Sequence, residues 1–223
     1  MRLFNYRMNI IHSIDLTLTM SQGHGCAMLD QPPRRRIMNP TAKHAAILAA
    51  ASELFADPGY DRTSIADISS KAGVAVGTVY RLFDDKRAVL AAVHDAVEDE
   101  FIEAIYEGWS AGGTVEARMA AIAAGLFATA ARLSRIVMVL SEQRFDGAKS
   151  RNSKQRTVAA IAQIIEDGIR QGLMRDTPPL PTAEIGYGVV SGAMAGCFMR
   201  EKAGDPELYV GLVSRTLFDL VRK

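Results

Sequence analysis

The side chains best suited to recognising another molecule gather in residues 65–82. Thr78, Tyr80 and Arg81 fall on one short predicted helix and bring a hydroxyl, a phenol and a guanidinium group. An arginine placed in this way is able to pair with the edge of guanine in a major groove, which contributes roughly 1–3 kcal/mol of base discrimination. Gly73 precedes the helix and tolerates the left-handed backbone of a tight turn between two helices. The spacing is typical of a helix-turn-helix.

Small and apolar residues occupy the positions at which the two helices of such a motif cross. We expect these contacts to come from Ile68, Ser69, Ala72, Val74, Val79 and Leu82. The residues left facing outward, or toward the start of the second helix, are Val76, Gly77, Thr78, Tyr80 and Arg81. The same spacing also fits one more tight corner in an all-helical protein, so the pattern alone leaves both interpretations open.

The remaining reactive side chains do not form a catalytic or metal-binding pattern. The four histidines stand at positions 12, 24, 44 and 94, and the two cysteines stand at 26 and 197. These spacings match neither a zinc site nor a disulfide framework, and the sequence holds no glycine-rich phosphate loop. We expect no enzyme activity, no cofactor and no metal. An enzyme with a helical core is kept as a second hypothesis, and a helical adaptor that binds protein partners as a third.

Composition and charge fit a globular protein of the cytoplasm. Hydrophobic residues make up 48% of the chain, charged residues 23%, and the net charge is +1. Residues 34–87 hold nine Lys or Arg against six Asp or Glu, so this segment is locally basic. The longest apolar stretch, 187–199, is too short to span a bilayer. We therefore expect a cytoplasmic protein with no membrane partner.

Helical periodicity covers nearly everything after residue 40, and no run alternates long enough to indicate a strand. The sequence predicts an all-α fold, with an N-terminal head of three helices and a body of six. Ser64 and Asp67 are spaced as a capping box, and Asp84 and Asp85 suit the positive end of a following helix. The nine predicted helices cover 41–56, 64–72, 76–83, 84–108, 114–130, 132–145, 152–171, 182–203 and 206–222.

Three segments follow from these breaks in periodicity. Residues 1–39 are predicted to form a flexible N-terminal arm, 40–87 the helix-turn-helix domain, and 88–223 a helical body. The arm ends in an arginine run made of Arg34, Arg35 and Arg36. This run suits an adjacent minor groove or phosphates, and the alternative is a solvated arm that aids solubility. The methionines at 8, 20, 28 and 38 leave the translation start open.

The strings at 59–68, 72–83 and 84–86 resemble the TetR family at the spacing of its N-terminal domain. The resemblance implies that Thr78 and Tyr80 contact phosphates or bases, that Gly77 allows close approach to the DNA backbone, and that Lys86 meets a phosphate. The full DNA-binding set that we expect is Thr63, Ser64, Val76, Gly77, Thr78, Tyr80, Arg81, Lys86 and the three arginines of the arm.

This sequence departs from the family pattern at three positions. Ala75 and Val76 stand where the family often has Ser and Lys, which removes a helix cap that typically contributes about 1 kcal/mol. Leu82 replaces the usual aromatic residue before Phe83.

For the body, the resemblance implies a ligand pocket and a dimer built through residues 182–222. Small residues in this stretch would allow a second helix to approach closely. Aromatic residues and methionines suit an adaptable apolar pocket, although most such residues belong to an ordinary core. The predicted pocket residues are Trp109, Phe127, Met138, Phe145, Tyr187, Met194 and Phe198.

The function that the resemblance implies is that of a one-component transcriptional regulator. We expect a homodimeric repressor that binds a near-palindromic DNA operator and is released by a small-molecule effector. The alternatives are a DNA-binding activator and a helical adaptor without a small-molecule ligand.

Overall fold

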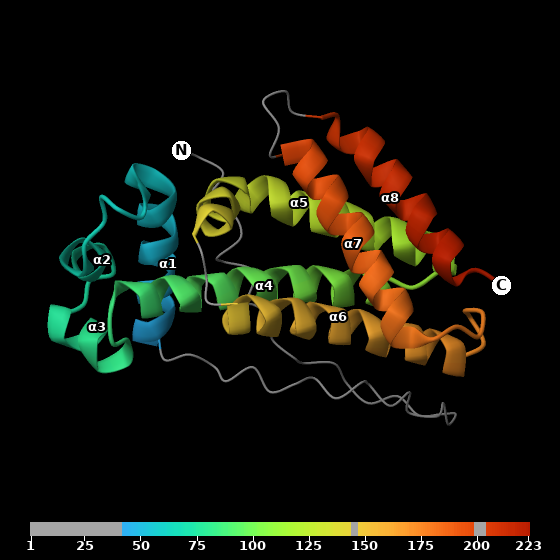
Figure 1. The fold of residues 1–223 in the computed structure, drawn as a ribbon, viewed down its shortest axis with the longest axis horizontal. Coiled ribbons are helices and arrows are strands. Elements are labelled where there is room, and N and C mark those ends of the chain that lie inside the picture. The colour runs from blue at the N-terminus through green and yellow to red at the C-terminus, as the bar shows by residue number, and fades with distance from the viewer. Residues whose placement is uncertain (1–41, 144–146, 199–203) are drawn as a thin grey trace, which may run out of the picture. The chain divides into compact units, whose positions relative to one another are not determined.

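The computed structural model describes the backbone of residues 42–143, 147–198 and 204–223, with side chains throughout except at 147–153 (Figure 1). Within these ranges every regular element is helical and no strand is present, which confirms the predicted all-α class. Residues 40–223 form one compact unit. The predicted arm, with Arg34, Arg35 and Arg36, lies outside the described residues.

Eight α-helices and one π-helical turn make up the described fold. In chain order they are α1 (Ala42–Leu54), η1 (Phe55–Gly59), α2 (Ile65–Lys71), α3 (Val76–Leu82), α4 (Lys86–Ser110), α5 (Val115–Glu142), α6 (Gly147–Arg170), α7 (Pro179–Phe198) and α8 (Pro206–Val221).

Local side-chain chemistry sets the limits of the first helices. The predicted capping box is present, because the Ser64 hydroxyl accepts from the backbone of Asp67 while the Asp67 carboxylate accepts from the backbone of Ser64. Gly73 has a φ of 66°, which confirms the left-handed turn between α2 and α3. Asp85 caps α4 by accepting from the backbone N–H of Ala88 at 2.7 Å. These devices fix where α2, α3 and α4 begin.

One apolar core joins α1, α2 and α3 to the longer helices that follow. Phe55, Ile68 and Val79 have no exposed surface, and they pack with Val89 and Val93 of α4. The same core includes Ile136 and Leu140 near the end of α5. The helix-turn-helix is therefore seated directly on α4 and α5.

The body is built from α4, α5, α6, α7 and α8. α5 packs along α4 and α8, α6 lies beside α4 and contacts α7, and α7 packs beside α8 (Figure 1). Gly108 permits the close approach of α4 to α5, because a Cβ at this position would lie 2.6 Å from the Ile122 backbone. Among the described residues, α5 alone is long and apolar enough to span a membrane by length and composition, a test that the core helix of a helical body also passes.

Two predictions about the elements were wrong. The predicted helices 114–130 and 132–145 form the single helix α5, so the described body has five helices where six were expected. Ala130, Ala131 and Arg132 are good helix formers, and no Gly or Pro interrupts the hydrogen-bond ladder there. Leu82 is 38% exposed, because Phe83 takes the buried position at the end of α3.

Candidate nucleic-acid interface and ligand cavity

The outer face of α3 presents the side chains that the sequence predicted to be free. Tyr80 is 56% exposed, Arg81 is exposed, and Val76 is 41% exposed. No heavy atom lies within 4 Å of a Cβ placed at Gly77, so the chain is open to close approach there. Thr78 is half-buried. α3 therefore offers a phenol and a guanidinium group on a surface that another molecule is able to reach.

A buried anchor holds this face in place. Val79 lies between Thr78 and Tyr80 in sequence and has no exposed surface. It packs in the same core as Ile47 and Ile68. Because the anchor is on the opposite side of a two-turn helix, Tyr80 and Arg81 are held outward by packing on the other face. Ala75 provides no side-chain cap to α3, as its sequence indicated.

Lys86 is engaged within the protein. Its ammonium group donates to the carbonyl oxygens of Tyr60 at 2.9 Å and of Thr63 at 3.0 Å. It also lies 4.3 Å from the centroid of the Tyr60 ring. An ammonium group has three N–H donors, so one is left for another acceptor. Lys86 thus ties the start of α4 to the turn between η1 and α2.

Thr63 and Ser64 lie at the start of α2 but differ in exposure. Thr63 is 3% exposed, and its hydroxyl lies within hydrogen-bond distance of the carbonyl oxygens of Leu54 at 3.0 Å and Gly59 at 2.8 Å. This side chain holds the turn and does not face outward. Ser64 is exposed, but its hydroxyl and backbone N–H both bond to Asp67. Those hydrogen bonds from Ser64 hold the pKa of the Asp67 carboxyl below its usual value.

A cavity of about 250 Å³ opens between α4, α5, α6 and α7. Four of the predicted pocket residues line it, namely Met138, Tyr187, Met194 and Phe198. The other lining residues are mostly apolar, and they include Phe101, Ile105, Leu126, Ile161 and Val190. An apolar cavity of about 150 Å³ is already large enough to hold a benzene ring. The chamber has room for a larger apolar body.

The structure places the other predicted pocket residues elsewhere. Trp109 is buried in the core, and the guanidinium group of Arg118 lies 4.5 Å from its ring centroid. Phe127 is buried, with its ring centroid 5.9 Å from that of Phe198 and 6.4 Å from that of Tyr209. Neither Trp109 nor Phe127 lines this cavity. Phe145 lies outside the described residues.

Sequence reasoning missed the polar residues of the cavity wall. Glu98 of α4, Ser134 of α5, and Thr157 of α6 line it together with Ser191 of α7. The Thr157 hydroxyl donates to the Glu98 carboxylate at 2.8 Å. These two residues are 59 positions apart, so no local pattern could have paired them.

The environment of Tyr187 reflects both the burial and the charge of this wall. Burial raises the pKa of the Tyr187 hydroxyl above its usual value, the hydrogen bond with Ser191 opposes this, and the negative charge of Glu98 raises it further. The phenol therefore stays protonated at neutral pH and is available as a donor or an acceptor.

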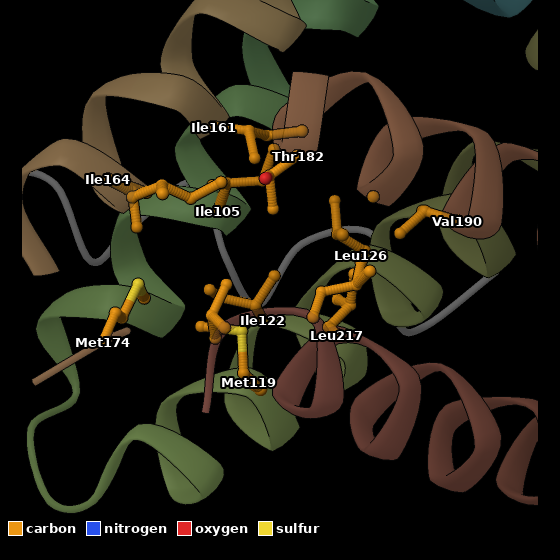
Figure 2. Close-up of a pocket in the computed structure, with 14 residues that line it drawn as sticks. Ile105, Met119, Ile122, Leu126, Ile161, Ile164, Met174, Thr182, Val190 and Leu217 are labelled. Carbon is orange, nitrogen blue, oxygen red and sulfur yellow. The ribbon is translucent and has the colours of Figure 1, made fainter. Parts of the chain in front are cut away.

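A second, smaller cavity of about 60 Å³ lies in the body (Figure 2). Its walls are almost wholly apolar, with Met119, Ile122 and Leu217 among them. The residues that line both cavities are Ile105, Leu126, Ile161 and Val190. Because they share these walls, the two spaces are neighbours in one apolar interior.

Comparison with known proteins agrees with this arrangement. Residues 47–93 match the family model described as bacterial regulatory proteins of the tetR family. The fatty acid metabolism regulator protein of Bacillus subtilis is 25% identical over 132 residues, covering 59% of this chain and 68% of its own length. The transcriptional repressor KstR2 of Rhodococcus jostii is 25% identical over 152 residues, covering 65% of this chain and 74% of its own.

Solved structures share the fold. The regulator FadR of Bacillus subtilis, solved in complex with stearoyl-CoA, superposes with a TM-score of 0.64 at 21% identity and covers 78% of this chain and 97% of that one. The relatives found are regulators and not enzymes, which sets aside the enzyme hypothesis. The N-terminal helix-turn-helix of this chain therefore matches the tetR family of bacterial regulatory proteins, and its described helical body shares the fold of the solved regulator.

Proposed function

We propose that this regulator is a homodimeric repressor that binds a near-palindromic operator through α3 and is released by an apolar small molecule held in the body. The observation that carries the DNA-binding part is the exposed face of α3, anchored from behind by Val79. The contacts that we propose are made by Val76, Gly77, Thr78, Tyr80 and Arg81, with Ser64 and Lys86 beside them. Repression is supported by the name of the KstR2 relative.

The exposed surface of α7 and α8 supports a dimer. Ile185, Leu208 and Leu212 are each more than half exposed, although they are large and apolar. Cβ atoms placed at Gly188 and Gly192 would meet no heavy atom within 4 Å, so α7 is open to another helix there. Large apolar side chains exposed on two packed helices suit an interaction site. Two copies joined here would present two recognition helices to half-sites about 34 Å apart.

α5 supports control by a ligand, because one stretch of it faces both the cavity and the helix-turn-helix. Ser134, Val137 and Met138 line the cavity, while Ile136 is buried in the core shared with α1, α2 and α3. A ligand that shifts this stretch must also shift the core against which the DNA-binding helices pack. Release then follows from a difference in ligand affinity between the two arrangements.

An apolar ligand fits the walls of the chamber. The B. subtilis relative is named as a regulator of fatty acid metabolism, and the structure of FadR holds stearoyl-CoA. These names support a ligand with a long apolar part. As a DNA-binding regulator of a bacterium, the protein is proposed to act in the cytoplasm.

The DNA-binding part is tested by selecting bound duplexes from a random-sequence library with the purified full chain. We expect enrichment of an inverted repeat with half-site centres about one helical turn apart. Sedimentation of the complex should give an even number of protomers per duplex. Recovery of no preferred sequence, or of an asymmetric site bound by a single protomer, would contradict the proposal.

The dimer is tested by placing a charge on its proposed face. Leu212→Glu should convert the protein to monomers in sedimentation velocity, because a carboxylate would be buried against the partner. Leu173→Glu is the control, since Leu173 is also exposed but follows α6 and lies on neither α7 nor α8. If both variants keep the mass of the unmodified protein, the dimer is not formed through this face.

A further inference from the structure

Among the described residues that line the larger cavity, Glu98 is the single charged one, and none is Lys, Arg or His. We propose that the chamber binds an elongated apolar amine, whose protonated nitrogen pairs with Glu98 and whose chain runs toward the smaller cavity. This inference rests on the proposed control by a ligand, and it names the chemical class of that ligand. An acyl anion is the class that it excludes.

The Glu98 carboxylate has a neutral partner and spare acceptor capacity. Thr157 donates one hydrogen bond to it at 2.8 Å. An ionised carboxylate has room for about four such bonds, so most of its acceptor positions remain for a ligand. Glu98 is half-buried on a mostly apolar wall, so its charge is only partly solvated and a cation or further donors would stabilise it. An ammonium group supplies both the charge and the donors.

Two arginines on the helices that pack beside α4 are paired with carboxylates other than Glu98. Arg156 pairs with Asp99 and lies 3.8 Å from Asp95. Arg132 pairs with Glu100 on the neighbouring stretch of α4. These pairs engage Arg156 and Arg132 with carboxylates other than Glu98.

Aromatic rings add a second attraction for a cation. Phe101, Tyr187 and Phe198 line the same chamber as Glu98. The face of an aromatic ring attracts a cation within about 6 Å of its centroid. Lys154 already uses the Tyr187 ring in this way, with its ammonium nitrogen 5.6 Å from the centroid. Lys154 is exposed and does not line the cavity, but it is the residue that an anionic ligand would use.

The apolar part of the ligand is defined by the shared walls. Ile105, Leu126 and Val190 border both the chamber of about 250 Å³ and the inner space of about 60 Å³ (Figure 2). A flexible alkyl chain is able to pass from one space into the other by displacing these side chains. Each additional buried CH₂ should tighten binding about fourfold, which corresponds to ~0.8 kcal/mol.

The test compares decylamine, decanol and decanoate, which share one chain length and differ in the head group. Calorimetric titration of the full chain, below the concentrations at which these amphiphiles form micelles, should show decylamine binding about tenfold or more tightly than decanoate, as expected for a hydrogen-bonded charge pair. Shortening the amine from ten to eight carbons should weaken binding progressively.

Glu98→Gln is the decisive variant, because it keeps the shape and the ability to accept from Thr157 while removing the charge. It should weaken decylamine binding about tenfold and change decanol binding by less than about twofold. Glu103→Gln is the matched control, since Glu103 is an exposed carboxylate on the same helix and does not line the cavity. That variant should bind decylamine as the unmodified protein does.

Three outcomes would overturn the inference: tighter binding of decanoate or decanoyl-CoA, equal binding of decylamine by Glu98→Gln, or binding of none of the probes. If Lys154→Ala then weakened the binding of decanoate or decanoyl-CoA, the chamber would be an anion site. Operator selection with the same protein distinguishes the two proposals. A preference for the amine without specific DNA binding would leave the ligand class standing and remove the regulator function, and the reverse result would remove the inference alone.

Discussion

Lys86 holds the beginning of α4 against the turn before α2, because its ammonium group donates to the carbonyl oxygens of Tyr60 and Thr63. The family resemblance assigns this lysine to a DNA phosphate, and one N–H remains for such a contact. A phosphate that accepted this N–H would be connected, through the Lys86 side chain, to the turn that precedes α2. The residue therefore has a structural role in the absence of DNA.

Cys197 is predicted to be unreactive in the folded protein. Its thiol has no exposed surface, and burial, together with the charge of Asp205, raises its pKa above the usual value. A raised pKa leaves less thiolate at neutral pH, and the thiolate is the reactive form. In a Cys26→Ser variant, labelling of the remaining thiol by a maleimide should be at least about tenfold slower in buffer than in denaturing urea. Equal rates in the two conditions would show that the thiol is accessible.

For individual residues, the sequence predicted which side chains are exposed better than it predicted which atoms those side chains contact. Tyr80 and Arg81 lie where the helix-turn-helix spacing put them. Thr63 was expected at the DNA but is buried, and its hydroxyl lies within hydrogen-bond distance of the carbonyl oxygens of Leu54 and Gly59. Glu98 was not singled out at all, since its position on the cavity wall depends on α6 and α7 folding against α4. Such long-range contacts have no local signature.

At the scale of the elements, the cap of α2 should depend on pH. The Asp67 carboxyl has a lowered pKa in the folded protein, so its contribution to stability is present above the unfolded value of about 3.9 and is lost as the pH falls below it. Ser64→Ala should cost about 1 kcal/mol at pH 7 in urea unfolding. That cost should shrink as the pH falls below about 4.

Thr114 provides the control for this cap. Its hydroxyl caps α5 by accepting from the backbone N–H of Ala117 at 3.2 Å. Ala117 has no carboxylate that could accept from the backbone of Thr114, as Asp67 accepts from Ser64. The cost of Thr114→Ala should therefore be nearly constant over the same pH range. If the costs of Ser64→Ala and Thr114→Ala fell together at low pH, acid would be weakening the whole fold, and the Asp67 carboxylate would not be the cause.

The contact of α4 with α5 depends on the missing side chain at Gly108. A Cβ there would lie 2.6 Å from backbone atoms of Ile122, which are not free to move aside. Gly108→Ala should lower the free energy of unfolding by about 1–3 kcal/mol, as overpacking does. Gly125→Ala, on α5, should be neutral or stabilising by up to about 1 kcal/mol, because its Cβ would lie 3.6 Å from Ala104 and alanine favours a helix. Chemical unfolding monitored by circular dichroism measures both, and equal stability of the two variants would contradict the close approach.

The elements themselves were largely readable from the sequence, and the exceptions have a common cause. Gly73 and Ser64 act locally, so the limits of α2 were predicted correctly. The break predicted near residue 131 is absent, because periodicity shifts where α5 changes its neighbours without any residue that interrupts the helix. A change in packing partners resembles a helix end when only the sequence is available.

At the scale of the whole molecule, α5 connects the two activities that we propose. It lines the ligand chamber with Ser134 and Met138, and it contributes Ile136 to the core beneath the DNA-binding helices. An exposed ion pair between Arg135 and Asp57 of η1, with 3.2 Å between nitrogen and oxygen, adds little energy but lies at the same junction. The predicted division into 40–87 and 88–223 stays a prediction about function, because one core crosses it.

The most direct test of the account is the affinity of the double variant Tyr80→Ala, Arg81→Ala for the operator recovered by selection, measured by fluorescence anisotropy at fixed salt. Both side chains are exposed, so the variant should unfold at the temperature of the unmodified protein. Arg170→Ala, which removes an exposed arginine from α6, is the control for net charge. We expect the double variant to lose about tenfold or more in affinity and the control to change by less than about twofold. Unchanged affinity in the double variant would contradict the assignment of α3 as the DNA-reading helix.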